Sequence, residues 1–361
     1  MAITRDTLRL VAELRAGTDR IVDDVTRGIV TAWVKAWDEI AAEFVAAIAD
    51  LITSGGARWP ARGHVLRARR TITALDLAAR TMRGLAVDLR ADTAAAARDA
   101  ATAAGRAQGE LVASQLPYGS TQAAAARHRR VREDAIDTIV RRTAEQVHAS
   151  SWPLADEAVE AMKAELVRGV VLGKNPKAAA GRMVKRVEGQ FNGGMARAVN
   201  IARTEVLDAH RAAAETSQAD HGDVLDGWIW HAELKKDRGR TCASCWVMHG
   251  TVHPMSVPGP IDHQSGRCAR VPKTKSWAAL GFDIDEPADQ FPTGEAVFAG
   301  LPREEQEKIM GRARLELLDG GGVGWADLSQ LRATPGWRDS RGVRPVRDLQ
   351  RIADERTLPP A

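Results

Sequence analysis

Apolar residues recur at helical spacing through the first 215 or so residues of the chain. The clearest run places apolar side chains three or four residues apart, as on the buried face of an amphipathic helix. Its members are Val25, Ile29, Trp33, Trp37, Ile40, Phe44, Ile48 and Leu51. Glycine favours the end of a helix, so the run predicts one long helix that ends within Ser54-Gly55-Gly56.

Further helices are predicted downstream. A second apolar stripe begins at Val65 and leads into an alanine-rich stretch at 93–107, where small side chains allow close packing. Residues 121–149 predict a third, more polar helix. Pro153 suits the first turn of a fourth helix. Asn175 followed by proline predicts the start of a fifth, which runs to about residue 216 and has a point of interruption at its Gly193-Gly194 pair.

The pattern changes after about residue 220. Residues 224–234 are rich in tryptophan and β-branched side chains and predict a strand. Glycine and proline are frequent over 235–275, which predicts short strands and turns. A helix is predicted over 302–321, and the last 35 or so residues, with several Pro, Gly and Arg, predict an extended tail.

All three cysteines of the chain lie in this second part, with a histidine between the last two. The spacing is Cys242-x2-Cys245-x17-His263-x4-Cys268. A Cys-x2-Cys pair presents two thiolates to one ion from a tight turn, and a later pair of ligands completes a tetrahedron. Zn²⁺ suits this donor set. Four protein ligands leave no position for water, so the spacing predicts a structural zinc site whose occupancy is coupled to folding.

Other interpretations of the cluster remain open at this point. The cysteines could be three unrelated buried thiols in a reducing compartment. A catalytic metal site could use His249 or His253 in place of one ligand. A Cys-x2-Cys redox pair is a further alternative, although no βαβ pattern surrounds it.

The predicted fold class is therefore α+β, mainly α. Residues 1–150 are expected to form a long helical region, 151–275 a small zinc-stapled α/β module, and 276–361 a C-terminal helix with an extended tail. No apolar run reaches the ~18–20 residues that span a bilayer. The first ten residues show no signal-peptide pattern, so no membrane association is expected.

The net charge of +4 is unevenly distributed. Residues 1–50 carry 6 basic and 9 acidic side chains, whereas 51–150 carry 16 and 9. Two basic clusters, 58–70 and 127–132, are either solvated helix faces or contacts to an acidic partner such as DNA. The candidate contact residues are Arg67, Arg69, Arg70, Arg127, Arg129 and Arg130.

The Cys/His cluster and its flank resemble the phage head morphogenesis domain of Mu F-like minor head proteins of tailed bacteriophages. The resemblance starts in "RAVNIARTEVLDAHRAAA" (197–214), continues through "GWIWHAEL" and through Asp237 to Cys245, and ends at His263 and "GRCARVP". It covers about 175–275, and 300–328 less closely. Gly266 replaces a cysteine that is common in the family, and His210 replaces an asparagine.

The resemblance implies a non-enzymatic virion protein. Such a protein is assembled in the host cytoplasm and lies in low copy number inside the capsid near the portal. It acts in head assembly and in DNA retention or ejection. The implied partners are the portal protein, the scaffold or major capsid protein, and packaged DNA.

The family's structural motif falls on Arg203, Thr204 and Glu205, together with Asp237. Residues two apart on a helix face different neighbours. We therefore expect Arg203 or Glu205 to tie this helix to the metal-bearing hairpin by a charge-assisted hydrogen bond. Two alternatives are solvated surface charges and a catalytic Arg/Glu pair as in ADP-ribosyl transfer, for which no nicotinamide pocket is recognisable.

Two functions compete with a structural virion protein. A zinc-dependent nuclease of the HNH or zinc-ribbon type could draw general bases from His249, His253, Asp262 and His263. A nuclease needs an open metal position, which the four best ligands do not leave. A sequence-independent DNA-binding protein would use the two basic clusters.

Overall fold

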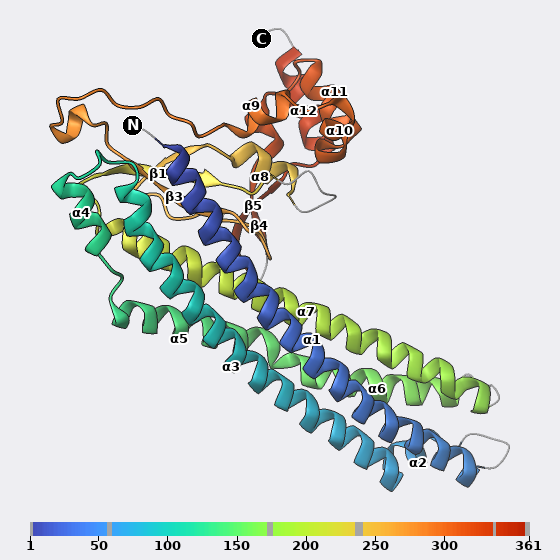
Figure 1. The fold of residues 1–361 in the computed structure, drawn as a ribbon. Coiled ribbons are helices and arrows are strands. Elements are labelled where there is room, and N and C mark those ends of the chain that lie inside the picture. The colour runs from blue at the N-terminus through green and yellow to red at the C-terminus, as the bar shows by residue number, and fades with distance from the viewer. Residues whose placement is uncertain (1–2, 56–59, 172–175, 235–240, 335–336, 358–361) are drawn as a thin grey trace. The chain divides into compact units, whose positions relative to one another are not determined.

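The computed structural model describes residues 3–55, 60–171, 176–234, 241–334 and 337–357, and helices dominate it (Figure 1). The mainly α, α+β class is confirmed. The chain forms two compact units. Unit 1 comprises Met1–Thr18, Ala100–Ile136 and His210–Ala361, and unit 2 comprises Asp19–Asp99 and Asp137–Ala209. Four of the long helices contribute residues to both units, and the expected division at residues 150 and 275 stays a prediction.

In its described residues, unit 2 contains only helices. It contains α2 (Arg62–Arg67), α6 (Pro153–Val171), and parts of α1 (Arg5–Gly55), α3 (Arg69–Ala113), α5 (Glu133–Ser151) and α7 (Pro176–Ala219). The predicted apolar stripe of α1 supplies much of its core, with Ile29, Trp33, Ile40, Phe44, Ile48 and Leu51 buried. Trp33 is fixed further, since its Nε1 donates to the carbonyl of Phe191 at 3.1 Å. Helix α7 runs through Gly193 and Gly194 without a break.

The predicted helix over 121–149 is instead two helices, α4 (Thr121–His128) and α5. Arg129 takes an extended backbone conformation after α4. The break lets buried Val131 pack against α3, where a Cβ on Gly105 would come within 2.8 Å of the valine side chain. A Cβ on Gly109 would lie 2.5 Å from the carbonyl oxygen of Ala126. Glycine at these two positions therefore allows the close approach of this segment to α3.

The core of unit 1 contains a small antiparallel sheet. The central strand β1 (Leu225–His231) lies between β2 (Val252–Pro254) and β3 (Ala269–Thr274). The strand predicted over 224–234 is thus confirmed, and its Trp228 and Trp230 are buried. The expectation of only strands and turns over 235–275 is wrong, because the short helix α8 (Ala243–Met248) lies between β1 and β2.

The C-terminal segment is folded over the described residues. Its elements are η1 (Ala278–Leu280), α9 (Gly294–Ala299), α10 (Arg303–Met310), α11 (Arg312–Asp319), η2 (Trp325–Leu328), β4 (Ser329–Thr334), β5 (Trp337–Val343) and α12 (Val346–Thr357). The helix predicted over 302–321 is divided at Gly311, where φ is +75°. The prediction of an extended tail is wrong, because β4 and β5 pair as a hairpin and α12 buries Leu349.

None of the helices in the described ranges combines the length and apolar character that crossing a membrane requires.

Candidate metal centre

Helix α8 presents two of the predicted ligands from its first turn. Cys242 caps the helix, and its sulfur accepts a hydrogen bond from the backbone N–H of Cys245 at 3.4 Å. This turn brings the two Sγ atoms to 3.3 Å from each other. The two-residue spacing between the cysteines therefore places both sulfurs close enough to bind one ion, as the sequence pattern predicts.

The loop between β2 and β3 brings His263 to the same point. Its Nε2 lies 3.4 Å from Cys242 Sγ and 3.5 Å from Cys245 Sγ. Around one tetrahedral zinc ion a sulfur and a nitrogen lie about 3.5 Å apart, and two sulfurs lie about 3.8 Å apart. The two sulfur–nitrogen distances therefore fit a common ion, and the sulfur–sulfur distance of 3.3 Å is somewhat shorter than such an ion would set.

Cys268, directly before β3, lies in a second donor group. Its Sγ, Cys245 Sγ and an Asp262 carboxylate oxygen lie within 4.8 Å of one another. The two groups share Cys245. The structure therefore gathers all four predicted ligands around Cys245 and adds Asp262, so these five residues are positioned to bind a metal ion.

Asp262 organises the loop that carries two of the ligands. Its Oδ1 accepts the backbone N–H of His263 at 2.8 Å, and its Oδ2 accepts that of Cys268 at 2.9 Å. The same Oδ1 lies 3.7 Å from His263 Nε2 and 3.9 Å from Cys245 Sγ. From the sequence, Asp262 was considered only as a general base of a nuclease. Its position next to a predicted ligand was the one available signal for this second role.

Arginines from two helices hold the loop in place. Arg211 of α7 donates from Nε to the carbonyl of Cys268 at 2.9 Å, and its Nη2 donates to the carbonyl of Gly266 and contacts Asp262. Arg15 of α1 donates to the carbonyl of Arg267. The ligand-bearing loop is thus fixed to residues more than fifty positions away in the chain, which no local pattern reveals.

The close contacts among the candidate ligands shift the pKa values of Cys242, Cys245 and His263. Hydrogen bonds from Cys245 and from His263 lower the pKa of the Cys242 thiol to about 5, against the effect of burial. The hydrogen bond with Cys242, supported by the charge of Asp262, raises the pKa of His263 to about 10. The neighbouring sulfurs and burial raise the pKa of Cys245. A thiolate–imidazolium pair therefore occupies the site when no metal is present.

Asp262 stays charged despite its burial. Desolvation alone would raise its pKa, but Arg211, His263 and the two backbone N–H donors outweigh that effect and hold the pKa below its ordinary value. Its oxygens are engaged by the backbone and by Arg211. The sulfur of Cys268 is the softer donor and the better match to the other three ligands.

The histidines that a catalytic site would need have other contacts. His249 Nδ1 accepts the backbone N–H of Ala232 at 3.0 Å, and burial lowers the pKa of His249 to about 4. His253 stacks on Trp228 with 4.3 Å between ring centroids, and its Nε2 lies 2.9 Å from Thr251 Oγ1. Neither histidine belongs to a group of three or more metal donors among the residues that the structure describes.

The motif residues on α7 have a separate environment. Thr204 and Glu205 are buried in unit 2, Arg203 is partly exposed, and the Thr204 hydroxyl donates to the carbonyl of Asn200 at 2.7 Å. That Arg203 or Glu205 ties α7 to the metal-bearing hairpin stays a prediction. The tie that is visible comes from Arg211, further along the same helix. Asp237 lies outside the described residues.

Most of the candidate DNA-contacting arginines have partners within the protein. Arg70 pairs with Glu43 at 3.2 Å, Arg127 with Glu110 at 3.2 Å, and Arg129 with Asp223 through two hydrogen bonds of 2.6 and 2.8 Å. Arg130 donates to the carbonyl of Arg129 at 2.9 Å. Arg67 and Arg69 are exposed where α2 and α3 meet. The 127–132 cluster therefore makes ion pairs and hydrogen bonds within unit 1, and its contact with DNA stays a prediction.

No protein-family model, curated protein or solved structure matches the chain. The resemblance to Mu F-like proteins therefore depends on the quoted sequence motifs alone. The geometry of the metal centre stands independently of it.

Proposed function

We propose that Cys242, Cys245, His263 and Cys268 bind one Zn²⁺ ion as a structural centre. Three thiolates and an imidazole are the donors that zinc prefers. The separations among Cys242, Cys245 and His263 agree with a shared ion. Asp262 lies beside these ligands and is engaged by backbone N–H groups and Arg211, which leaves Cys268 as the fourth ligand.

A structural role agrees with the surroundings of the site. Four protein ligands fill the coordination sphere, so neither water nor substrate binds the ion. Helix α8 carries two ligands, and its Ala243, Trp246 and Val247 pack into an apolar core with C-terminal residues such as Leu328 and Leu349. A zinc ion bound here joins the loop before β3 to that core through α8.

The chain as a whole is, in this proposal, a non-enzymatic minor head protein of a tailed bacteriophage. It acts inside the capsid near the portal, in low copy number, in contact with the portal protein, the scaffold or major capsid protein, and packaged DNA. One observation carries the proposal: Cys and His side chains positioned to bind a metal ion follow the helix with "ARTE" (202–205) in the motif order of the Mu F-like domain.

Metal analysis of the purified chain tests the zinc centre. We expect about one zinc per chain, and a Cys242→Ser variant that retains less zinc and unfolds more readily, since zinc binding is coupled to folding. His253→Ala is the matched control, because His253 lies near β1 without belonging to the donor groups. Zinc-free protein whose Cys242→Ser variant is as stable as the wild type would refute the centre.

The virion function is tested separately. Purified particles of the phage that encodes the chain should contain it at a few copies per DNA-filled head, and its gene should lie beside a portal gene. A DNA-cleaving activity that His249→Ala abolishes and Cys242→Ser leaves intact would instead identify a nuclease.

A further inference from the structure

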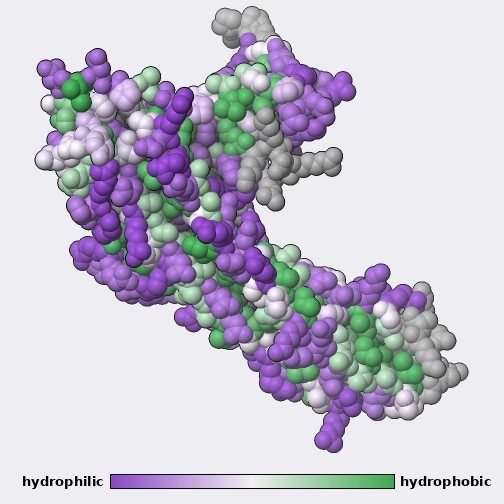
Figure 2. All heavy atoms as spheres, in the orientation of Figure 1, coloured by the Kyte–Doolittle hydropathy of each residue, from purple (hydrophilic) through white to green (hydrophobic). Residues whose placement is uncertain are grey.

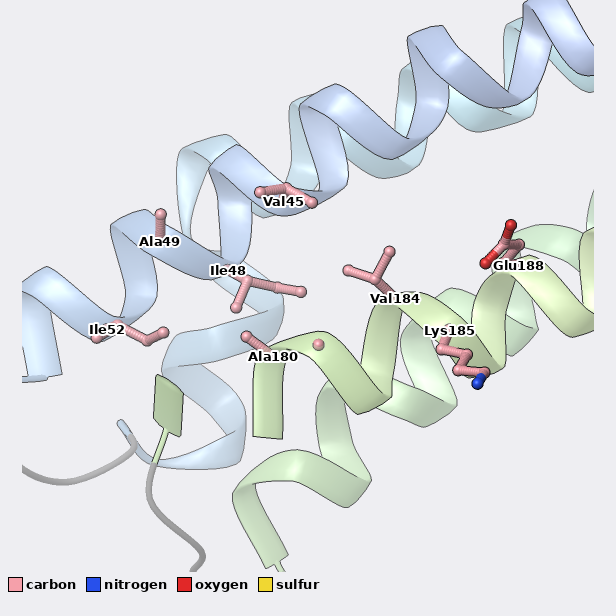
Figure 3. Close-up of a pocket in the computed structure, with 9 residues that line it drawn as sticks. Val45, Ile48, Ala49, Ile52, Ala180, Val184, Lys185 and Glu188 are labelled. Carbon is pink, nitrogen blue, oxygen red and sulfur yellow. The ribbon is translucent and has the colours of Figure 1, made fainter. Parts of the chain in front are cut away.

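Helices α1 and α7 border an apolar groove within unit 2. Its volume is about 430 Å³, and its lining includes Val45, Ile48 and Ile52 of α1 together with Val184 of α7 (Figure 3). Val45, Ile48 and Val184 point into the space between the two helices, and Lys185 and Glu188 stand on the α7 side of it. The groove is therefore apolar at its centre and carries one charge of each sign at its rim.

The apolar surface extends along α1 beyond the groove. Val34 and Val45 are 53% and 49% exposed. They are eleven residues apart, which is three turns of an α-helix, so both lie on the same face. Hydrophobic residues are visible at the surface where the end of α1 and the start of α7 lie (Figure 2). From Val34 to Ile52 the face is about 27 Å long, at 1.5 Å per residue.

The neighbouring surface of α7 carries two glycines. A Cβ added to Gly181 or to Gly189 would meet nothing within 4 Å. Glycine is unfavourable in the interior of a helix compared with alanine, and packing within the described residues does not require it at these two positions. Small residues on a helix surface allow the backbone of a second helix to approach closely.

The charges and the glycines of α7 complement one another about a two-fold axis. If two copies of α7 cross antiparallel, with the axis at the level of residues 186 and 187, Lys185 of each copy lies opposite Glu188 of the other. In the same arrangement Val184 lies opposite Gly189, so that an apolar side chain meets a position without one. A two-fold interface places one surface against itself and so requires this kind of self-complementarity.

We propose that the α1/α7 face of unit 2 binds a second copy of this chain in an antiparallel, two-fold arrangement. The α7 helix of each copy then lies against the groove of the other. Two adjacent helices are about 20 Å wide, so the 27 Å face offers each copy several hundred Å² of contact. Stable interfaces bury roughly 800 Å² per partner, and 27 Å by 20 Å is roughly 540 Å², so the face has the size of a weak, reversible dimer interface.

Sedimentation velocity of the full-length, zinc-loaded chain over a range of concentrations tests the proposal. The wild type should show a monomer–dimer equilibrium. Lys185→Glu and Glu188→Lys should each weaken dimerisation about tenfold, because two attractive pairs become repulsive. The double variant Lys185→Glu/Glu188→Lys should restore it, since each reversed charge again faces its opposite.

A second pair of variants separates dimerisation from folding. Gly189→Gln places a side chain where the second copy would approach; it should weaken the dimer while leaving the monomer at least as stable, because glutamine favours helix. Val87→Glu is the control, since Val87 is 57% exposed on α3 and does not line the groove. A chain that stays monomeric at all concentrations, or a double charge variant as weak as the single ones, would overturn the proposal.

Discussion

Arg211 and Asp262 form a buried ion pair beside the candidate metal ligands. Arg211 Nη2 lies 3.4 Å from Asp262 Oδ2, and the two side chains are 6% and 1% exposed. The carboxylate in turn holds the backbone N–H groups of His263 and Cys268. Helix α7 therefore helps to position the backbone of two predicted metal ligands, because its Arg211 holds the carboxylate that accepts their N–H groups.

Replacing Arg211 by methionine should destabilise the protein strongly. The substitution breaks a buried ion pair by removing one partner, which typically costs about 3–5 kcal/mol. We expect the free energy of unfolding in urea to fall by this amount. Zinc affinity, measured by competition with a chelator, should fall as well, because the loop carrying His263 and Cys268 loses its support.

The control for this variant is Arg197→Met on the same helix. Arg197 pairs with Glu157 at 3.0 Å, but both side chains are about half exposed. Exposed pairs contribute roughly 0–1 kcal/mol, so this change should be small. Equal effects of the two substitutions would show that Arg211 does not support the centre.

Gly266→Ala should disturb the centre by crowding Asp262. A Cβ at this position would lie 2.2 Å from the carboxylate of Asp262, so the loop must shift to accept it. We expect a loss of about 1–3 kcal/mol in the free energy of unfolding, as for other overpacked sites. Zinc affinity should fall together with stability.

Gly84→Ala provides the comparison for that substitution. Gly84 lies within α3, and a Cβ there would meet nothing within 4 Å. Alanine should therefore stabilise the helix by about 0.5–1 kcal/mol. If Gly266→Ala also raised stability and kept zinc, the described packing of the loop would be incorrect.

Zinc binding should release protons near neutral pH. The pKa of His263 is raised to about 10, and that of Cys245 is also raised, so both groups hold a proton in the metal-free protein. Metal ligands must be deprotonated, so at least these two protons, roughly two per ion, should leave on binding. Calorimetry in buffers of different ionisation enthalpy measures this number, and a heat that does not change with the buffer would contradict it.

Acid should destabilise the fold through His231. Burial, with help from His249 and Arg15, lowers the pKa of His231 to about 3. The unfolded chain therefore binds a proton near pH 6.5 that the folded chain does not bind until about pH 3. The stability that the neutral ring contributes is present above pH 6.5 and is lost as the pH falls, at about 1.4 kcal/mol per pH unit.

His231→Gln should make stability less dependent on pH between about 6 and 4. Glutamine does not titrate in this range. The slope of the free energy of unfolding against pH should therefore fall by the contribution of one histidine, about 1.4 kcal/mol per pH unit. Losses that come from protonation of the metal ligands are common to both proteins and cancel in the comparison. An unchanged slope would mean that His231 is protonated in the folded state.

The long helices and the ligand spacing were predictable because both depend on local pattern. The stripe from Ile29 to Leu51 repeats at the helical period over several turns, and it forms the core of unit 2. Cysteine and histidine are common zinc ligands, so their residue types alone indicate a metal site. A single turn of the chain is enough to bring the sulfurs of Cys242 and Cys245 together.

The features that were missed depend on contacts between distant segments. Arg211 and Asp262 are 51 residues apart, and nothing near either one indicates the other. Helix α8 has only six residues, in a region where glycine and proline favour turns. In the largely polar helix α12, Leu349, Ile352 and Ala353 are buried or partly buried because they pack against a core formed by distant segments.

Helix α8 packs against C-terminal residues as well as supporting the candidate ligands, which limits how far the chain can be shortened. Ser244, between the two cysteines, has its Oγ 2.7 Å from Oγ of Ser329, and Trp246 is fully buried among C-terminal residues. A fragment truncated after β3 would keep every proposed ligand but would expose Trp246 to solvent. Such a fragment should aggregate and be poorly soluble. Studies of the proposed zinc-binding region in isolation therefore need to retain the chain through α12.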